Sequence, residues 1–238
     1  MTRTRLLTAL AIAAALLIAS LMALDAGPFA SNPSTPGATP SKDPGPVMAT
    51  VDGRPVYLSE MRSRVEGLQT VHGDFAEVFG EDWPETLLQN LVDDKIVEQQ
   101  AAALGITVSD EEIRAHVDEL RSRFPTDQAF QDWLEAGRMD EGELADRITL
   151  QTLASELYLQ VTGDVSVSGA AVHRYFKGHL DDYPGVDGEG APFTAVREQI
   201  RDDLLKVERD RAYGEWLDTE RGLVEVVVVL PDWWKEFA

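Results

Sequence analysis

Repeated helix start and stop signals between residues 58 and 222 restrict this chain to a mostly helical fold. The stretches 109–112 (SDEE) and 140–143 (DEGE) each place an acidic residue three positions after a capping residue, which is typical of a helix start. Pro84 suits the first turn of a helix, and Gly105, Gly137 and Gly222 suit helix ends. Apolar residues recur at helical spacing between these signals. The sequence therefore predicts helices over about 58–71, 84–104, 110–124, 126–136, 140–161, 168–176 and 193–221.

Two short segments at opposite ends of this helical region favour strands instead. In residues 48–57 the pair Asp52-Gly53 stands between β-favouring residues and indicates a hairpin turn. Residues 223–230 (LVEVVVVL) form a nearly continuous apolar, β-branched run, which predicts a buried or well-paired strand. We therefore expect a mostly α-helical module closed by a small β-sheet, in which the N-terminal hairpin pairs with the C-terminal strand.

The first 46 residues have the composition of a targeting segment and a linker. Arg3 and Arg5 precede an apolar run over residues 6–24, whose length of about 28 Å as a helix matches a bilayer core of about 30 Å. Residues 27–46 contain six prolines among small polar residues, which is typical of an extended linker. We divide the chain into a signal anchor or signal peptide (1–24), a Pro-rich linker (25–46) and a folded domain (47–238).

The charge distribution predicts where the domain lies. Because the basic residues precede the apolar run and acidic residues dominate after it, the positive-inside rule places the body on the periplasmic or extracytoplasmic side of the inner (cytoplasmic) membrane, held there by a single span. An uncleaved anchor is favoured over cleavage after Ala23, Ala26 or Ala30, since none of these has a clean pair of small residues. The net charge of −21 makes nucleic acid an unsuitable partner.

The residue types needed for catalysis or metal binding do not form a recognisable pattern. The chain has no cysteine, so disulfides, thiolate ligands and thiol nucleophiles are excluded. His173 and His179 could join Asp181 and Asp182 in a metal cluster, but their six-residue separation puts the two imidazoles on different helix faces. Acid pairs such as Asp93-Asp94 fit helix starts and solvated faces better than acid–base chemistry. We therefore predict no catalytic, cofactor or metal site.

Aromatic residues are the best candidates for a binding surface. Core packing is the default explanation for all of them, whereas a groove for apolar segments of other proteins would also use such large side chains. The tail at 232–237 (DWWKEF) offers the same choice between a binding surface and a cap over the core. The candidate client-binding residues are Phe75, Phe79, Trp83, Phe130 and Trp133.

Four stretches carry a resemblance to a known family: ATVDGRPVYLSEM, LLQNLVDDKIVEQQAAALGITVSDEEI, GDVSVSGAAVHRYF and FTAVREQIRDDLLKVERDRAYGEWL. In content and order they resemble the N-terminal domain of the SurA, PrsA and PpiD group of extracytoplasmic chaperones. In the catalytic members of that group a parvulin isomerase domain lies between the last two helices. Here only the loop over residues 181–192 stands at that place. The resemblance therefore implies the chaperone scaffold without the isomerase.

These observations lead to one expected function and two alternatives. We expect a membrane-tethered extracytoplasmic chaperone that binds unfolded, partly folded or nascent exported proteins without isomerase catalysis and without a cofactor. A dedicated assembly partner of one envelope complex would need the same scaffold and tether. A residual peptidyl-prolyl isomerase is the enzymatic alternative, and the short loop speaks against it.

Overall fold

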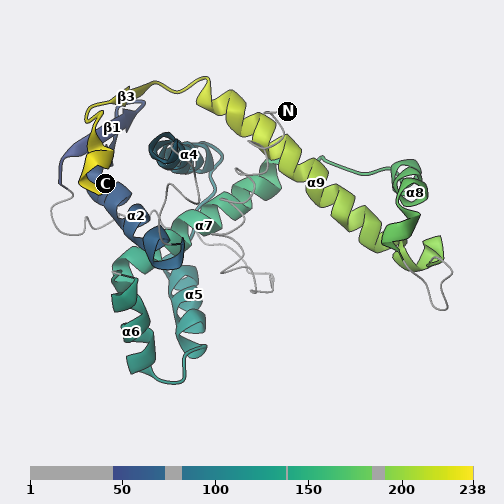
Figure 1. Cartoon of the computed structure of the whole chain (residues 1–238), viewed down its shortest axis with the longest axis horizontal. Coiled ribbons are helices and arrows are strands. Elements are labelled where there is room, and N and C mark those ends of the chain that lie inside the picture. Colours follow the sequence, from purple (N-terminus) through teal and green to yellow (C-terminus); the bar gives the residue numbers. More distant parts are fainter. Residues whose placement is uncertain (1–44, 73–81, 138, 184–190, 238) are drawn as a thin grey trace.

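The computed structural model describes residues 45–72, 82–137, 139–183 and 191–237. The predicted fold class is confirmed, since helices dominate and a small antiparallel sheet closes the domain (Figure 1). The helices are α2 (Leu58–His72), α4 (Trp83–Ala103), α5 (Asp110–Ser122), α6 (Asp127–Ala136), α7 (Glu141–Val161), α8 (Gly169–Gly178) and α9 (Phe193–Arg221). The strands are β1 (Val47–Val51), β2 (Arg54–Tyr57) and β3 (Val226–Val228), and short 3₁₀ turns cover Leu180–Asp182 and Trp233–Phe237.

Both predicted capping boxes are present. At the start of α5 the Ser109 hydroxyl accepts from the Glu112 amide at 3.2 Å, and the Glu112 carboxylate accepts from the Ser109 amide at 2.8 Å. Asp140 and Glu143 exchange the same pair of bonds at the start of α7. Each box satisfies amides that a helix start leaves without an intrahelical partner. These local bonds fix where α5 and α7 begin.

Glycine ends α4 in the way that its position predicted. Gly105 has a φ of +73°, a left-handed conformation that side chains disfavour. The Gly105 amide donates to the Ala102 carbonyl at 3.1 Å and the Ile106 amide to the Ala101 carbonyl at 2.8 Å. This pair of bonds defines a Schellman motif, which satisfies the last carbonyls of the helix. The chain then turns sharply from α4 into α5.

The hairpin and the C-terminal strand form one sheet in the order β2-β1-β3. Asp52 and Gly53 have φ values of 49° and 75°, as a type I′ hairpin turn requires. The Asp52 amide donates to the Glu225 carbonyl at 2.9 Å, and its carboxylate accepts from the Glu225 amide at 2.8 Å. Ala49 pairs with Val228 and Val51 with Val226. The predicted pairing between the two ends of the domain is therefore confirmed.

The expected burial of the C-terminal strand is wrong. Residues Val226, Val227 and Val228 keep 40%, 47% and 41% of their surface exposed, and Leu223 keeps 74%. The strand pairs with β1 on one side only, and no helix in the described ranges covers its faces fully. The buried residue of this end is Trp233, which is 5% exposed and packs in the core. The C-terminal tail thus acts as the cap over the core that was one of its two predicted roles.

Two hydrophobic cores divide the described residues. The first joins the sheet, α2, α4 and Trp233, with Met48, Met61, Leu87 and Ile96 among its fully buried members. The second joins α5, α6 and α7 and is formed by Phe130, Leu134, Leu144 and Ile148, with partly buried neighbours around them. Helix α7 packs on both α4 and α5, so it connects the two cores.

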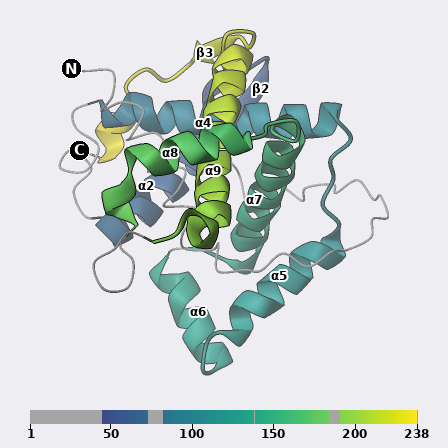
Figure 2. The same ribbon diagram turned by 90° about the vertical axis from the view of Figure 1, so that its right-hand side faces the viewer.

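Two helical extensions project from the body. Figures 1 and 2 both place α5 and α6 at the end of the molecule away from the sheet. Helix α8 packs along α9, far from β1 and β3, and Val172 and Ile200 are fully buried between them. The body therefore presents large helical surfaces on both sides of α7.

Acidic residues of α4 hold the neighbouring helices by ion pairs. The Arg221 guanidinium at the end of α9 forms a bidentate pair with Asp93, with N–O distances of 2.7 and 2.6 Å. Asp94 pairs with Arg64 of α2, and Lys95 pairs with Glu60 of α2 at 3.1 Å. Because most of the Arg221 and Asp93 surface is buried, water screens their attraction weakly. Helix α4 is thus fixed to both α2 and α9.

Replacing Arg221 by alanine leaves the Asp93 carboxylate partly buried without its bidentate partner. We expect this change to lower the free energy of unfolding by about 2 kcal/mol in urea titrations. Arg211→Ala is the matched control, because its ion pairs with Glu208 and Glu215 are exposed and should contribute much less to the stability. Equal effects of the two changes would contradict a special role for the Asp93–Arg221 pair.

Because β3 is exposed and Trp233 is buried, substitutions at these two places should lower the free energy of unfolding by different amounts. Trp233→Ala should destabilise the domain by about 3–5 kcal/mol because it empties a core position. Val227→Thr should change the stability by less than about 0.5 kcal/mol, because the side chain is half exposed. Thermal and urea unfolding of the two variants checks this order. A larger loss for Val227→Thr would show that the apolar strand, and not the tryptophan, stabilises the closure.

Candidate client-binding surface

Three aromatic rings meet where α5 ends and α6 begins. Phe124, Phe130 and Trp133 have ring centroids 5.4 to 6.0 Å apart, and we call them the α6 aromatic cluster. The Thr126 hydroxyl caps α6 by accepting from the Ala129 amide at 3.1 Å. Because positions three apart are neighbours on a helix, Phe130 and Trp133 then lie side by side. Local capping thus assembles the cluster.

The members of the cluster differ in their access to solvent. Phe130 is fully buried, whereas Trp133 keeps 37% of its surface exposed. Phe130, a predicted client-binding residue, therefore offers no surface to a partner. Its ring stacks against the Trp133 ring. Within α6 only Phe130 and Leu134 are buried. Phe124 is partly buried, so Trp133 is the most exposed member of the cluster.

Arg121 fixes the cluster from the side of α5. Its guanidinium carbon lies 4.9 Å from the Phe130 ring centroid, a cation–π geometry, and it donates to Glu141 of α7 at 2.8 Å. Gln131 of α6 donates to the other oxygen of Glu141, also at 2.8 Å. One carboxylate at the start of α7 therefore holds α5 and α6 together next to the aromatic cluster.

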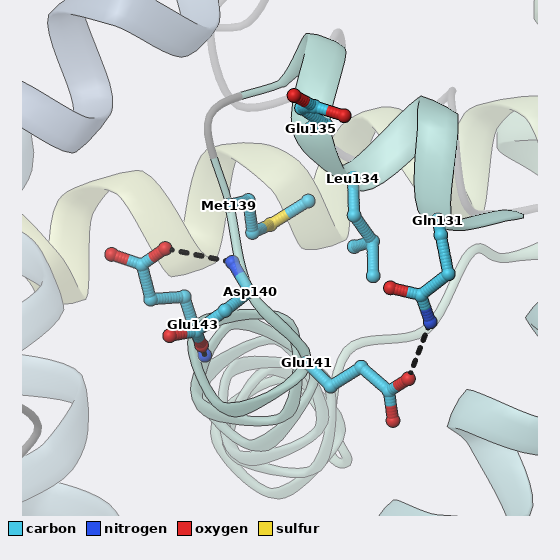
Figure 3. Close-up of a pocket in the computed structure, with 7 residues that line it drawn as sticks. All are labelled: Gln131, Leu134, Glu135, Met139, Asp140, Glu141 and Glu143. Atoms are coloured by element: carbon cyan, nitrogen blue, oxygen red, sulfur yellow. Dashed lines mark hydrogen bonds between the residues drawn. The ribbon is translucent and has the colours of Figure 1, made fainter.

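A shallow hollow lies next to the cluster, between α6 and the start of α7 (Figure 3). Leu134 and Met139 supply its apolar lining, and acidic side chains surround them. Glu141 accepts from Gln131 and Arg121, and Asp140 and Glu143 are used by the capping box. These three carboxylates already have structural partners, so the hollow is an acidic margin of the aromatic surface.

The other predicted aromatic residues lie elsewhere. Trp83 packs edge-on against Trp233 at 5.8 Å and is partly buried against the first core, so it belongs to the closure of the sheet. Phe75 and Phe79 lie outside the described residues. Of the three described candidates, Phe130 and Trp133 lie together, whereas Trp83 belongs to the first core.

A second aromatic group was missed by the sequence analysis. The ring centroid of Phe193, at the start of α9, lies 5.3 Å from that of Phe176 in α8 and 5.0 Å from that of His173. Tyr183 lies 6.0 Å from Phe176. The signal was present in the sequence, because Phe176 and Phe193 stand on both sides of the loop at 181–192, but only the fold shows that α8 and α9 lie together.

The histidines of this region have local partners. The His179 ring stacks on Tyr175 with centroids 4.0 Å apart, and its Nδ1 lies 2.8 Å from the Tyr175 carbonyl oxygen. His173 instead faces Phe193. Within the ranges that the structure describes, no group of three or more metal-binding side chains converges.

The titratable groups with shifted pKa values lie mainly where helices meet. Burial raises the pKa of Asp94, although the nearby Arg64 opposes this effect, and burial raises the pKa of Glu98. Burial and the charges of Asp93 and Asp94 raise the pKa of Tyr213 to about 12. These groups join α4 to α2 and α9, so their environment reflects packing between helices.

Fold and surface together define a helical domain closed by a small sheet, with a partly exposed tryptophan in an aromatic cluster and a strongly acidic composition. Among the described helices, none is both long and apolar enough to cross a bilayer, and residues 6–24 lie outside the described part.

The chain belongs to the SurA-like N-terminal domain family, whose model matches residues 2–158. Foldase protein PrsA of Clostridium acetobutylicum is 27% identical over 132 residues, which cover 51% of this chain and 40% of that protein. The matched part thus spans less than half the length of that relative. The predicted resemblance to the SurA and PrsA group is confirmed.

Proposed function

We propose that this protein is an extracytoplasmic chaperone that holds unfolded or partly folded exported proteins through weak apolar contacts, without catalysing prolyl isomerisation. Membership in the SurA-like N-terminal domain family supports a chaperone or foldase-related role. The name of its relative, a foldase, points to the same class of activity. The exposed Trp133 above a buried aromatic support is the single structural observation that carries the binding step.

Holding a client requires contacts that form and break readily. A partly exposed tryptophan supplies a large contact area with few side-chain rotations to freeze. The acidic side chains around the neighbouring hollow add charge at the margin of this surface. With a net charge of −21, the protein also repels other copies of itself, which keeps loaded complexes apart. Apolar binding and mutual repulsion are both properties that a chaperone needs.

The proposal includes a tether at the membrane. Residues 6–24 form an apolar run long enough to span a bilayer, with Arg3 and Arg5 before it. The Pro-rich linker over residues 25–46 would then separate the folded domain from the lipid surface. Exported chains emerging from the membrane would meet the domain at that distance.

The first prediction of this proposal concerns aggregation. The full-length chain should suppress the light scattering of an unfolded exported protein at near-equal molar ratio and without nucleotide. Trp133→Ser should weaken the apparent affinity for that client roughly tenfold, because a central tryptophan commonly dominates an interface.

Leu159→Ser is the matched control, since Leu159 is also exposed, at 51%, but lies on α7 outside the aromatic cluster. It should leave suppression unchanged. If the unaltered protein fails with a range of clients but co-purifies with one stoichiometric partner, the dedicated assembly role replaces the general chaperone. A large loss of thermal stability in Trp133→Ser would instead assign that side chain to the core.

The second prediction concerns isomerisation. Only residues 183–192 connect the 3₁₀ turn after α8 to α9, the place where the resemblance puts a parvulin domain. The protein should therefore leave the cis-to-trans relaxation of a short X-Pro peptide at its uncatalysed time constant of tens of seconds or more. An acceleration that scales with protein concentration would establish the isomerase alternative.

The third prediction concerns the tether. Full-length protein expressed in its own envelope should stay in the membrane fraction after carbonate washing, because the apolar run at 6–24 would remain in the bilayer. A chain that lacks residues 1–24 serves as the soluble reference. Recovery of a soluble mature form beginning near residue 27 would show that the segment is a cleaved signal peptide.

A further inference from the structure

Strand β3 forms an edge of the sheet and carries the longest exposed apolar run in the described part of the chain. The order β2-β1-β3 leaves the outer side of β3 without a described strand partner. Val226 to Val229 each keep between 40% and 51% of their surface exposed. Natural proteins usually protect edge strands with charges, prolines or bulges, because such edges pair with other chains. No charged residue or proline interrupts these four valines.

The hydrogen-bond register shows which backbone groups point outward. Glu225 accepts from the Asp52 amide at 2.9 Å, and the Val229 amide donates to the Met48 carbonyl at 2.8 Å, so both residues face β1. Because backbone groups in an antiparallel ladder alternate in direction, Val227 also faces β1 and Val226 and Val228 face away. Their N–H and C=O groups form a short row that only an extended backbone can complete.

From this row we propose that β3 binds an extended, β-branched segment of an unfolded client as a fourth strand of the sheet. The inference rests on the proposed chaperone function and names the client feature that it recognises. Backbone pairing supplies the geometry, and valines on both faces of β3 favour apolar side chains in the added strand.

Charge selects a client segment over a second copy of this chain. Asp52 and Glu225 stand at the end of β3, and each copy carries a net charge of −21, so edge-to-edge pairing of two copies brings like charges together. A client segment flanked by lysine or arginine is instead attracted by these carboxylates. We therefore infer preference for apolar strands with basic flanks.

Amide hydrogen exchange of the full-length chain tests this inference directly. The probe is a short peptide of alternating valine and threonine with lysines at both ends. On its addition the Val226 and Val228 amides should gain roughly tenfold or more protection, whereas the Val227 and Val229 amides, already directed to β1, should change little. The same peptide with N-methylated backbone amides keeps its charge and side chains and should give no protection.

A pair of variants separates backbone pairing from apolar contact. Val228→Pro removes an outward N–H and spares the bonds to β1, and it should weaken peptide binding roughly tenfold. Val228→Thr keeps the backbone and the shape of the side chain and should bind within about twofold of the unaltered chain. If circular dichroism shows that the proline variant is unfolded, the exchange pattern of the unaltered chain still decides.

Three outcomes would overturn the inference. Uniform protection of all four valine amides, or equal binding of the N-methylated peptide, would show that the strand is not extended by a backbone. Protection that rises with protein concentration alone, together with a doubled mass in sedimentation, would assign the edge to a second copy. If aggregation suppression remains while the peptide gives no protection, only this inference fails, whereas loss of suppression by the unaltered chain removes the proposed function itself.

Discussion

The arrangement of the helices depends on the charges that α4 carries on its partly buried faces. Asp93 and Asp94 are adjacent, so their side chains leave the helix in different directions, and each finds an arginine on a different neighbour. Arg221 brings the end of α9 to α4, and Arg64 brings α2. Since α9 leads directly into Gly222 and β3, the pair with Arg221 also determines where the C-terminal strand begins.

The ion pairs of α4 lie outside the second core, which is held by its own apolar contacts. The first core and the ion pairs hold α2, α4, α9 and the sheet, while the second core holds α5, α6 and α7. Trp133 packs on the second core through Phe124 and Phe130, and its burial is incomplete. A binding surface at a separate core can change its contacts without disturbing the closure of the domain.

Local signals were sufficient to predict most of the fold. The capping boxes, Gly105 and the Asp52-Gly53 turn each act over a few residues, so their effects could be read from the sequence. The degree of burial could not, because it depends on which elements meet. Phe130 and Trp133 are three positions apart and similarly apolar, yet only Phe130 joins Leu144 and Ile148 of α7 in the buried second core. For the same reason the valines of β3 were expected inside and Trp233 was left undecided.

The sheet joins residues that are far apart in the chain. Asp52 and Glu225, which bond to each other, are separated by 173 positions, so the third strand can join only after α9 has been synthesised. A two-stranded hairpin alone is marginally stable in water. During folding the β1–β2 hairpin must therefore wait for the last part of the chain, and loop closure over this distance makes the final pairing slow relative to helix formation. Until that pairing forms, the protein is itself an incompletely folded chain with an open apolar core.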